Sequence, residues 1–90
     1  MDKALVSVTG VDKPGIIAKI ATALFEMNIN VLEISQTILD HYFTMLMIVD
    51  LSAADIAFDG IAARLAQAGE DIGVAVSIQR TAIFDAMHRV

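Results

Sequence analysis

The sequence predicts an α+β domain in which one antiparallel sheet of four strands is covered on one face by two helices. Two observations support this fold class. Four segments show the two-residue alternation of strands, and two segments repeat apolar residues every three or four positions, as amphipathic helices do. Their order along the chain is strand, helix, strand, strand, helix, strand, which is typical of the split βαβ, or ferredoxin-like, arrangement.

The first strand is expected over residues 3–9, where every second residue is apolar, and it runs into a turn at Gly10. The residues after the turn repeat at helical spacing. The apolar row of this first helix consists of Ile16, Ile20, Leu24 and Met27.

Both ends of the first helix carry residues that are typical of helix boundaries. Pro14 suits the first turn, because its missing N–H would have no partner there in any case. Asn28 and Asn30 are expected to end the helix, since short amide side chains tolerate turn and left-handed conformations that Ile and Val avoid.

The next two strands are expected over residues 31–39 and 42–49, joined by a tight turn at Asp40 and His41. The first of them has an apolar face made of Leu32, Ile34 and Ile38. The second is apolar in both alternating sets, which is typical of a strand covered on both faces. Since the helices cover one face only, a second copy or the tail should cover the other.

A second helix is expected to follow, with capping residues in Ser52–Asp55 and its end at Gly69. The fourth strand contains an alternating set of Val74, Val76 and Ile78. These elements make a core of about residues 1–80. Residues 81–90 carry apolar residues at spacings of four and three, which predicts a short helical tail.

The composition limits what this single domain of residues 1–90 can do. A chain of this size gains stability from burial in an oligomer, and an apolar fraction of 57% indicates a protein interface, so a dimer or tetramer is expected. No apolar run approaches the roughly 20 residues of a membrane span, and no basic leader is apparent, so a cytoplasmic location is expected. A net charge of −5 argues against direct contact with nucleic acid.

The residues give no pattern typical of a catalytic or metal centre. There is no cysteine, and the two histidines, His41 and His88, stand far apart in the sequence. No serine, histidine and acid combination is recognisable either. We therefore expect no enzyme activity, no metal and no cofactor.

The turn before the first helix is the main candidate site. A helix entered through Gly10, Asp12 and Gly15 offers backbone N–H groups that no residue of the helix satisfies, and the helix dipole favours a negative charge there. A small carboxylate could bind at this place. A structural explanation stays open for each residue: glycine geometry at Gly10 and Gly15, a helix cap at Asp12, and helix termination at Asn28 and Asn30.

Four segments resemble a known family. They are GVDKPGI at residues 10–16, the Asn-Ile-Asn step at 28–30, ISQTILDHYFTM at 34–45 and IFDAMHRV at 83–90. The first two resemble the ACT domain, a small ligand-binding module of enzymes and regulators of amino-acid metabolism. The last two carry a closer similarity within this family, to stand-alone bacterial and archaeal proteins of the UPF0237 type, which are related to the glycine cleavage system transcriptional repressor.

The resemblance implies that two ACT domains bind an amino acid between the turn of one copy and the second strand of the other. Carried onto this sequence, it selects Gly10, Asp12, Pro14, Gly15 and Ile16 in the turn, and Asn28, Asn30, Val31 and Leu32 in the partner. The implied function is a non-catalytic sensor of a small amino acid, glycine or serine first, that signals to a protein partner. The alternative is a ligand-free oligomerisation or docking module for a metabolic enzyme or a transcriptional regulator.

Overall fold

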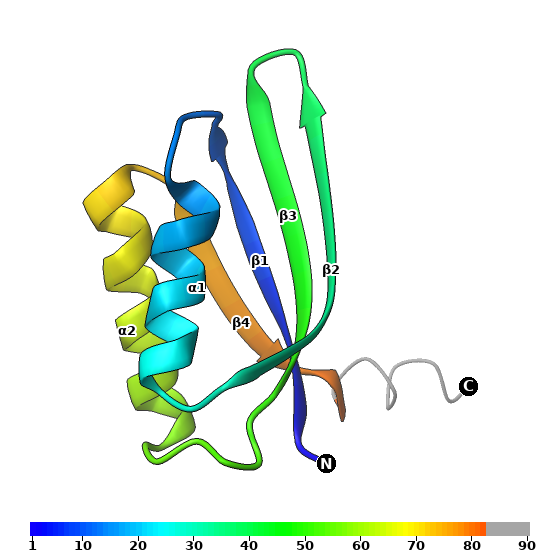
Figure 1. Cartoon of the computed structure of the whole chain (residues 1–90), viewed down its shortest axis with the longest axis vertical. Coiled ribbons are helices and arrows are strands. Elements are labelled where there is room, and N and C mark those ends of the chain that lie inside the picture. The colour runs from blue at the N-terminus through cyan, green and yellow to red at the C-terminus, as the bar shows by residue number, and fades with distance from the viewer. Residues whose placement is uncertain (83–90) are drawn as a thin grey trace.

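The structure is a computed structural model that describes residues 1–82 (Figure 1). Its elements are β1 (Lys3–Val11), α1 (Ile16–Glu26), β2 (Asn30–Leu39), β3 (Tyr42–Asp50), α2 (Phe58–Ile72) and β4 (Ala75–Arg80). This is the predicted order of elements. The prediction of a helical tail concerns mainly residues 83–90, which lie outside the described residues.

The four strands form one antiparallel sheet in the order β2-β3-β1-β4. Figure 1 shows α1 and α2 side by side on one face of this sheet, with β2 at the edge farthest from α2. The predicted ferredoxin-like arrangement is therefore confirmed.

The core lies between the sheet and the two helices. Alternate residues of β1 and β3 are buried beneath the helices, and they meet fully buried side chains such as Leu24 of α1 and Leu65 of α2. Full burial of a leucine stabilises a fold by about 1.5–3 kcal/mol. Phe43 and the methionines of β3 face the helices, so Leu46 and Ile48 form the set that faces away.

The boundaries around the first turn differ from the prediction. β1 continues through Gly10 to Val11, because Gly10 pairs with Phe43 in the sheet and the turn starts only after Val11. Pro14 lies in a turn before the helix rather than in its first turn, since α1 begins at Ile16 with Gly15 as its N-cap.

The end of α1 agrees with the prediction for Asn28. Its φ of 59° is left-handed, and the N–H groups of Asn28 and Ile29 donate to the carbonyls of Phe25 (3.1 Å) and Leu24 (3.0 Å). This pair of bonds is the Schellman motif, which satisfies carbonyls at the end of a helix. Asn30 takes no part in it, because it is already the first residue of β2.

The predicted boundaries of α2 were wrong at both ends. The helix continues past Gly69 and ends at Gly73, whose φ is 77°, so Gly73 has the terminating role expected of Gly69. Gly69 is buried against β4 instead. Within the described residues the N-cap, Ala57, has no side-chain cap, because Ser52 donates its hydroxyl to Asp50 (2.6 Å) and so ties the end of β3.

β2 is an edge strand, and all ten of its residues are exposed. A bulge between Val31 and Glu33 gives this strand one extra residue relative to β3, so Leu32 does not continue the alternation of Ile34 and Ile38. Beyond the bulge, Ile34 and Ile38 pair with the buried residues Met47 and Phe43 and therefore lie on the helix side of the sheet. The helices do not reach far enough to bury them.

Candidate functional site

The candidate site is built on the turn that connects β1 to α1. The N–H of Asp12 donates to the carbonyl of His41 (2.8 Å), which ties the turn to the tip of the β2–β3 hairpin. Gly15 then takes a left-handed conformation with a φ of 91°, which favours glycine, and this directs the chain into α1. The first helical bond runs from the N–H of Lys19 to the carbonyl of Gly15 (2.9 Å).

The first turn of α1 leaves backbone donors free. The N–H groups of Ile16, Ile17 and Ala18 have no acceptor among residues 1–82, and the N-cap Gly15 has no side chain to supply one. No acidic residue lies in this first turn. The positive end of the helix dipole and three unpaired donors thus lie together, an arrangement that suits an anionic group.

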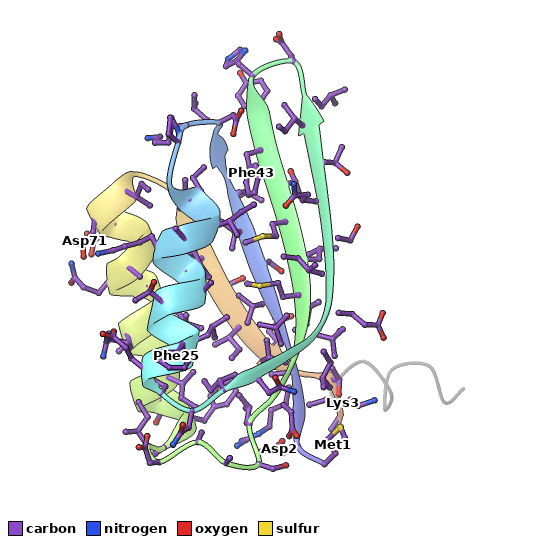
Figure 2. The ribbon with its side chains drawn as sticks, in the orientation of Figure 1. Met1, Asp2, Lys3, Phe25, Phe43 and Asp71 are labelled. Atoms are coloured by element: carbon purple, nitrogen blue, oxygen red, sulfur yellow. The ribbon has the colours of Figure 1, made fainter. Side chains whose placement is uncertain are left out.

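The residues that carry these donors line a hollow of about 260 Å³. The turn and helix contribute Asp12, Lys13, Gly15, Ile16, Ile17 and Ala18, and the sheet contributes Gln36, Ile38 and Phe43. Figure 2 shows Phe43 on β3 beside the start of α1. The hollow combines apolar walls with a few polar groups, which is the usual make-up of a small-molecule site.

Three polar side chains border this hollow. Asp12 is exposed and supplies a carboxylate, and Gln36 supplies an amide from the edge strand. Lys13 is half-buried, and its Nζ lies 2.8 Å from the position that a Cβ would take at Gly73, next to the last carbonyls of α2. The ammonium of Lys13 thus lies near the C-terminal end of α2, where the helix dipole favours a positive charge.

The structure brings together most of the predicted site residues that lie in the turn (the turn half of the site). It does not bring to them the predicted residues at the start of the second strand (the strand half). Asp12, Gly15 and Ile16 line the hollow. Pro14 lies in the same turn. Gly10 lies close to Val74, because a Cβ added at Gly10 would be 2.8 Å from Cγ1 of Val74. Gly10 is therefore required for close packing, which agrees with the structural explanation left open for it.

The strand half of the predicted site lies at the other end of α1. This half consists of Asn28, Asn30, Val31 and Leu32. The 11 residues of α1 span about 16 Å, so one copy of the chain does not bring the two halves together. In one copy, Asn28 has the local role of ending α1, and Asn30 pairs with Asp50 in the sheet.

Sequence reasoning missed six residues of the hollow: Lys13, Ile17, Ala18, Gln36, Ile38 and Phe43. The strand order contains a signal for the last three. In a βαββαβ sheet the end of β2 and the start of β3 lie at the same end as the turn after β1, so their helix-side residues must border it. The sequence did not show which set of residues faces the helices, because β3 is apolar in both of its alternating sets.

A second, smaller hollow of about 80 Å³ lies between α1 and α2. Its charged residues are already paired: Lys19 Nζ lies 3.4 Å from Asp71 Oδ2, and Arg64 pairs with Glu26. A hydrogen bond from Gln67, together with Lys19, holds the pKa of Asp71 below its usual value. These paired groups serve contact between the helices.

Residues 1–82 carry neither a cluster of metal-binding side chains nor a membrane-spanning helix. No cluster of three or more His, Asp or Glu side chains there could hold a metal ion. None of the helices within residues 1–82 is both long enough and apolar enough to cross a bilayer.

Comparison with known proteins identifies the family. Residues 2–79 match the family model described as ACT domain. A UPF0237 protein of Bifidobacterium longum is 50% identical over 90 residues, covering 100% of both chains. The solved structure of an ACT domain protein from Streptococcus pneumoniae has a TM-score of 0.83 and 38% identity, covering 97% of this chain and 98% of that one.

A more distant match concerns the regulator expected from the resemblance. The structure of a putative glycine cleavage system transcriptional repressor superposes with a TM-score of 0.74 at 18% identity, which shows a shared fold. The match covers 89% of this chain and 46% of that one. The superposed structures share the fold of this chain, and the family model and the full-length relative show that the chain belongs to the ACT domain family, among its UPF0237 proteins.

Proposed function

We propose that this ACT domain is a regulatory module that binds a free amino acid at the turn before α1, in a site completed by a second copy of the chain. The observation that carries this proposal is the group of three N–H donors at the start of α1 without an acceptor among residues 1–82, on residues that line one hollow together with Asp12. An amino acid has the matching pair of charges.

The ligand would be held mainly by the carboxylate and the ammonium that free amino acids share. Its carboxylate accepts hydrogen bonds from the free N–H groups of Ile16, Ile17 and Ala18, where the helix dipole favours negative charge. Its ammonium donates to the carboxylate of Asp12, and its side chain meets the apolar wall at Ile38.

The exposed edge of β2 supports the need for a second copy. This strand presents a row of unpaired backbone groups, and an antiparallel partner strand would satisfy them. Two β2 strands paired in this way run in opposite directions. The start of the partner's β2, with Asn30 and Val31, then lies at the same end of the sheet as the turn of the first copy.

Pairing of β2 would also cover apolar surface on the helix side of the sheet. Ile34 and Ile38 of β2 are exposed there, and so are Ile17 and Phe25 of α1, which share one side of that helix. Phe25, labelled in Figure 2, is 81% exposed. Burial of these side chains against a second copy would stabilise the dimer by about 25 cal/mol for each Å² of apolar surface removed from water.

Ligand binding regulates only if the occupied and empty dimers differ in affinity for something else. The receiver of this signal is a metabolic enzyme or a regulator that contacts the dimer. Glycine and serine are the first ligands to test, since the family resemblance points to glycine metabolism.

The test is a thermal-unfolding screen of the purified protein against the twenty amino acids. A ligand present at 100 times its Kd stabilises the folded state by about 2.7 kcal/mol, which raises the Tm of a domain of this size by about 10–20 °C. The variants Asp12→Ala and Asn30→Ala should lose the response, because the first removes the ammonium partner and the second alters the contribution of the second copy.

Asp55→Ala is the matched control. Asp55 is also an exposed aspartate, and it lies in the segment before α2, away from the turn. Its variant should respond like the unmodified protein. A flat response of the unmodified protein to all twenty amino acids would refute the sensor function and favour a ligand-free assembly module. An unchanged response of Asp12→Ala would refute the position of the site.

A further inference from the structure

Gln36 is a polar residue on a side of β2 that is otherwise apolar over residues 34–38. It pairs with Met45 of β3, which is only 1% exposed, and residues paired across neighbouring strands share one face of the sheet, so Gln36 lies on the helix side. Its neighbours on the same side of β2 are Ile34 and Ile38. Packing against the helices favours an apolar residue at this position, so the amide points to another role.

The amide of Gln36 is free to bind a ligand. Gln36 lines the hollow at the start of α1, together with Ile38 and Phe43 of the sheet. Within residues 1–82 its side chain makes no hydrogen bond with another residue. An amide offers a carbonyl acceptor and an NH₂ donor group, so Gln36 supplies both kinds of hydrogen-bonding group to the hollow.

The other two polar side chains at the hollow have different positions. The ammonium of Lys13 lies near the C-terminal end of α2, since its Nζ would be 2.8 Å from a Cβ added at Gly73. Asp12 lies in the turn, where its N–H donates to the carbonyl of His41, and its carboxylate is the partner of the ligand's ammonium in the proposed function. Gln36 is therefore the polar group that remains for the side chain of the ligand.

The register of the sheet places Gln36 at a distance from the start of α1. Figure 2 shows Phe43 beside the start of α1, and Ile38 pairs with Phe43. Gln36 lies two residues farther from the tip of the β2–β3 hairpin, which is about 6.6 Å along the strand. An amino acid whose carboxylate binds at the start of α1 thus approaches this amide only through a side chain, which glycine lacks. The apolar wall at Ile38 lies on the way and suits a methylene stem.

From these observations we infer that the ligand is an amino acid with a carboxamide side chain, asparagine or glutamine, and that Gln36 is the residue that selects it. This inference rests on the proposed function, because it concerns the same site. The NH₂ group of Gln36 donates to the carbonyl of the ligand's carboxamide, and the carbonyl of Gln36 accepts from its NH₂ group.

Other classes of side chain match the amide of Gln36 less well. An aliphatic side chain makes neither hydrogen bond. A carboxylate side chain accepts one hydrogen bond but cannot donate the other, and it brings a negative charge against an apolar wall and toward Asp12. Two hydrogen bonds between neutral groups correspond to about a 30-fold preference over an aliphatic side chain of the same shape.

Isothermal titration calorimetry with two sets of amino acids tests this inference. Asparagine, aspartate and leucine share one branched shape, and glutamine, glutamate and methionine are the corresponding longer set. The unmodified protein should bind the carboxamide of at least one set about 30-fold more tightly than the aliphatic member, and more tightly than the acidic one. Gln36→Leu should lose this preference. The readout is the ratio of affinities within a set, because a change in the association of the chains would alter all members alike.

Gln79→Leu is the matched control. Gln79 is also an exposed glutamine on an edge strand, β4, but it pairs with Leu5 on the face of the sheet away from the helices. This variant should keep the preference of the unmodified protein. Because both glutamines are exposed, neither substitution removes a core contact, and both variants should unfold near the Tm of the unmodified protein when no ligand is present.

The outcomes separate this inference from the proposed function. A protein that binds glycine or serine but neither carboxamide, or that binds carboxamide and aliphatic members equally, would overturn the selection by Gln36 and leave the amino-acid sensor standing. The selection is also wrong if the preference persists in Gln36→Leu, if it disappears in Gln79→Leu, or if the acidic members bind most tightly. A protein that binds none of the twenty amino acids refutes the proposed function, and the selection with it.

Discussion

An alanine at Gly69 and an alanine at Gly60 add the same methyl group to the same helix, and we expect them to change stability in opposite directions. At Gly69 the new Cβ would lie 2.6 Å from the carbonyl oxygen of Val74 and 2.7 Å from Cγ2 of Val76. Both distances are shorter than van der Waals contact, and the first involves backbone, so β4 would have to move. At Gly60 the nearest atom is Cδ1 of Ile56 at 3.4 Å, an ordinary contact.

The magnitudes follow from two opposing terms. Overpacking of a core costs about 1–3 kcal/mol, and replacing glycine by alanine inside a helix gains about 1 kcal/mol. Because β4 would have to shift its backbone, the overpacking cost at Gly69 lies at the upper end of this range. After the gain from replacing glycine in a helix is subtracted, Gly69→Ala should lose about 2 kcal/mol of unfolding free energy. Gly60→Ala lies in the first turn of α2 and should gain about 0.5 kcal/mol.

Thermal and urea unfolding of the two variants provide the assay. For a domain of this size, Gly69→Ala should lower the Tm by about 8–16 °C, and Gly60→Ala should raise it by about 2–4 °C. The urea m-value should stay unchanged in both, since neither variant alters the surface exposed on unfolding. A Gly69→Ala protein as stable as the unmodified one would show that α2 and β4 are not in this close contact, and the reasoning would fail.

Two further predictions concern residues outside α2. Asn28→Ala should lose about 1 kcal/mol of unfolding free energy, because the φ of 59° suits asparagine or glycine. Asn28→Gly should unfold at or above the Tm of the unmodified protein. Equal Tm values for the two variants would contradict the left-handed conformation of this residue. Ser52→Ala should be less stable at pH 7, because Ser52 donates its hydroxyl and its N–H to Asp50 and so lowers the pKa of that carboxyl below 3.8. A carboxyl whose pKa is lower in the folded state adds stability above its unfolded-state pKa, and this stability is lost as the pH falls through the folded-state pKa. The difference in Tm between Ser52→Ala and the unmodified protein should therefore narrow below pH 3.8. A Tm difference that widens in acid would contradict this prediction.

The order of the elements could be predicted from the sequence because each helix and strand has its own hydrophobic period. The end of α1 was also predictable, since an asparagine that tolerates a left-handed conformation, Asn28, stands between the apolar row of the helix and an apolar strand. The two glycines of α2 could not be distinguished in this way. Gly69 and Gly73 are both suited to end a helix, and the choice between them depends on how closely β4 packs, which is a tertiary contact.

The turn residues of the candidate site could be predicted from the sequence, but the residues of the sheet that form its walls could not. Asp12 and Gly15 lie in a short segment whose own residues indicate the start of a helix. Gln36 and Ile38 reach the hollow only through the strand order and through the pairing of β2 with β3. The side of the sheet on which they lie could not be predicted, because β3 is apolar in both alternating sets and the helices could cover either of them.

The bulge at Leu32 also determines how β2 would tolerate changes of length. Successive residues of a strand point to opposite faces of the sheet. Removing one residue after the bulge would therefore turn the residues of β2 that precede the deletion to the opposite face. Removing Leu32 itself would instead convert an irregular segment into a regular ladder and leave Ile34, Gln36 and Ile38 on their present side. A family of such domains can therefore gain or lose one residue at this single position of β2 while the wall of the hollow keeps its composition.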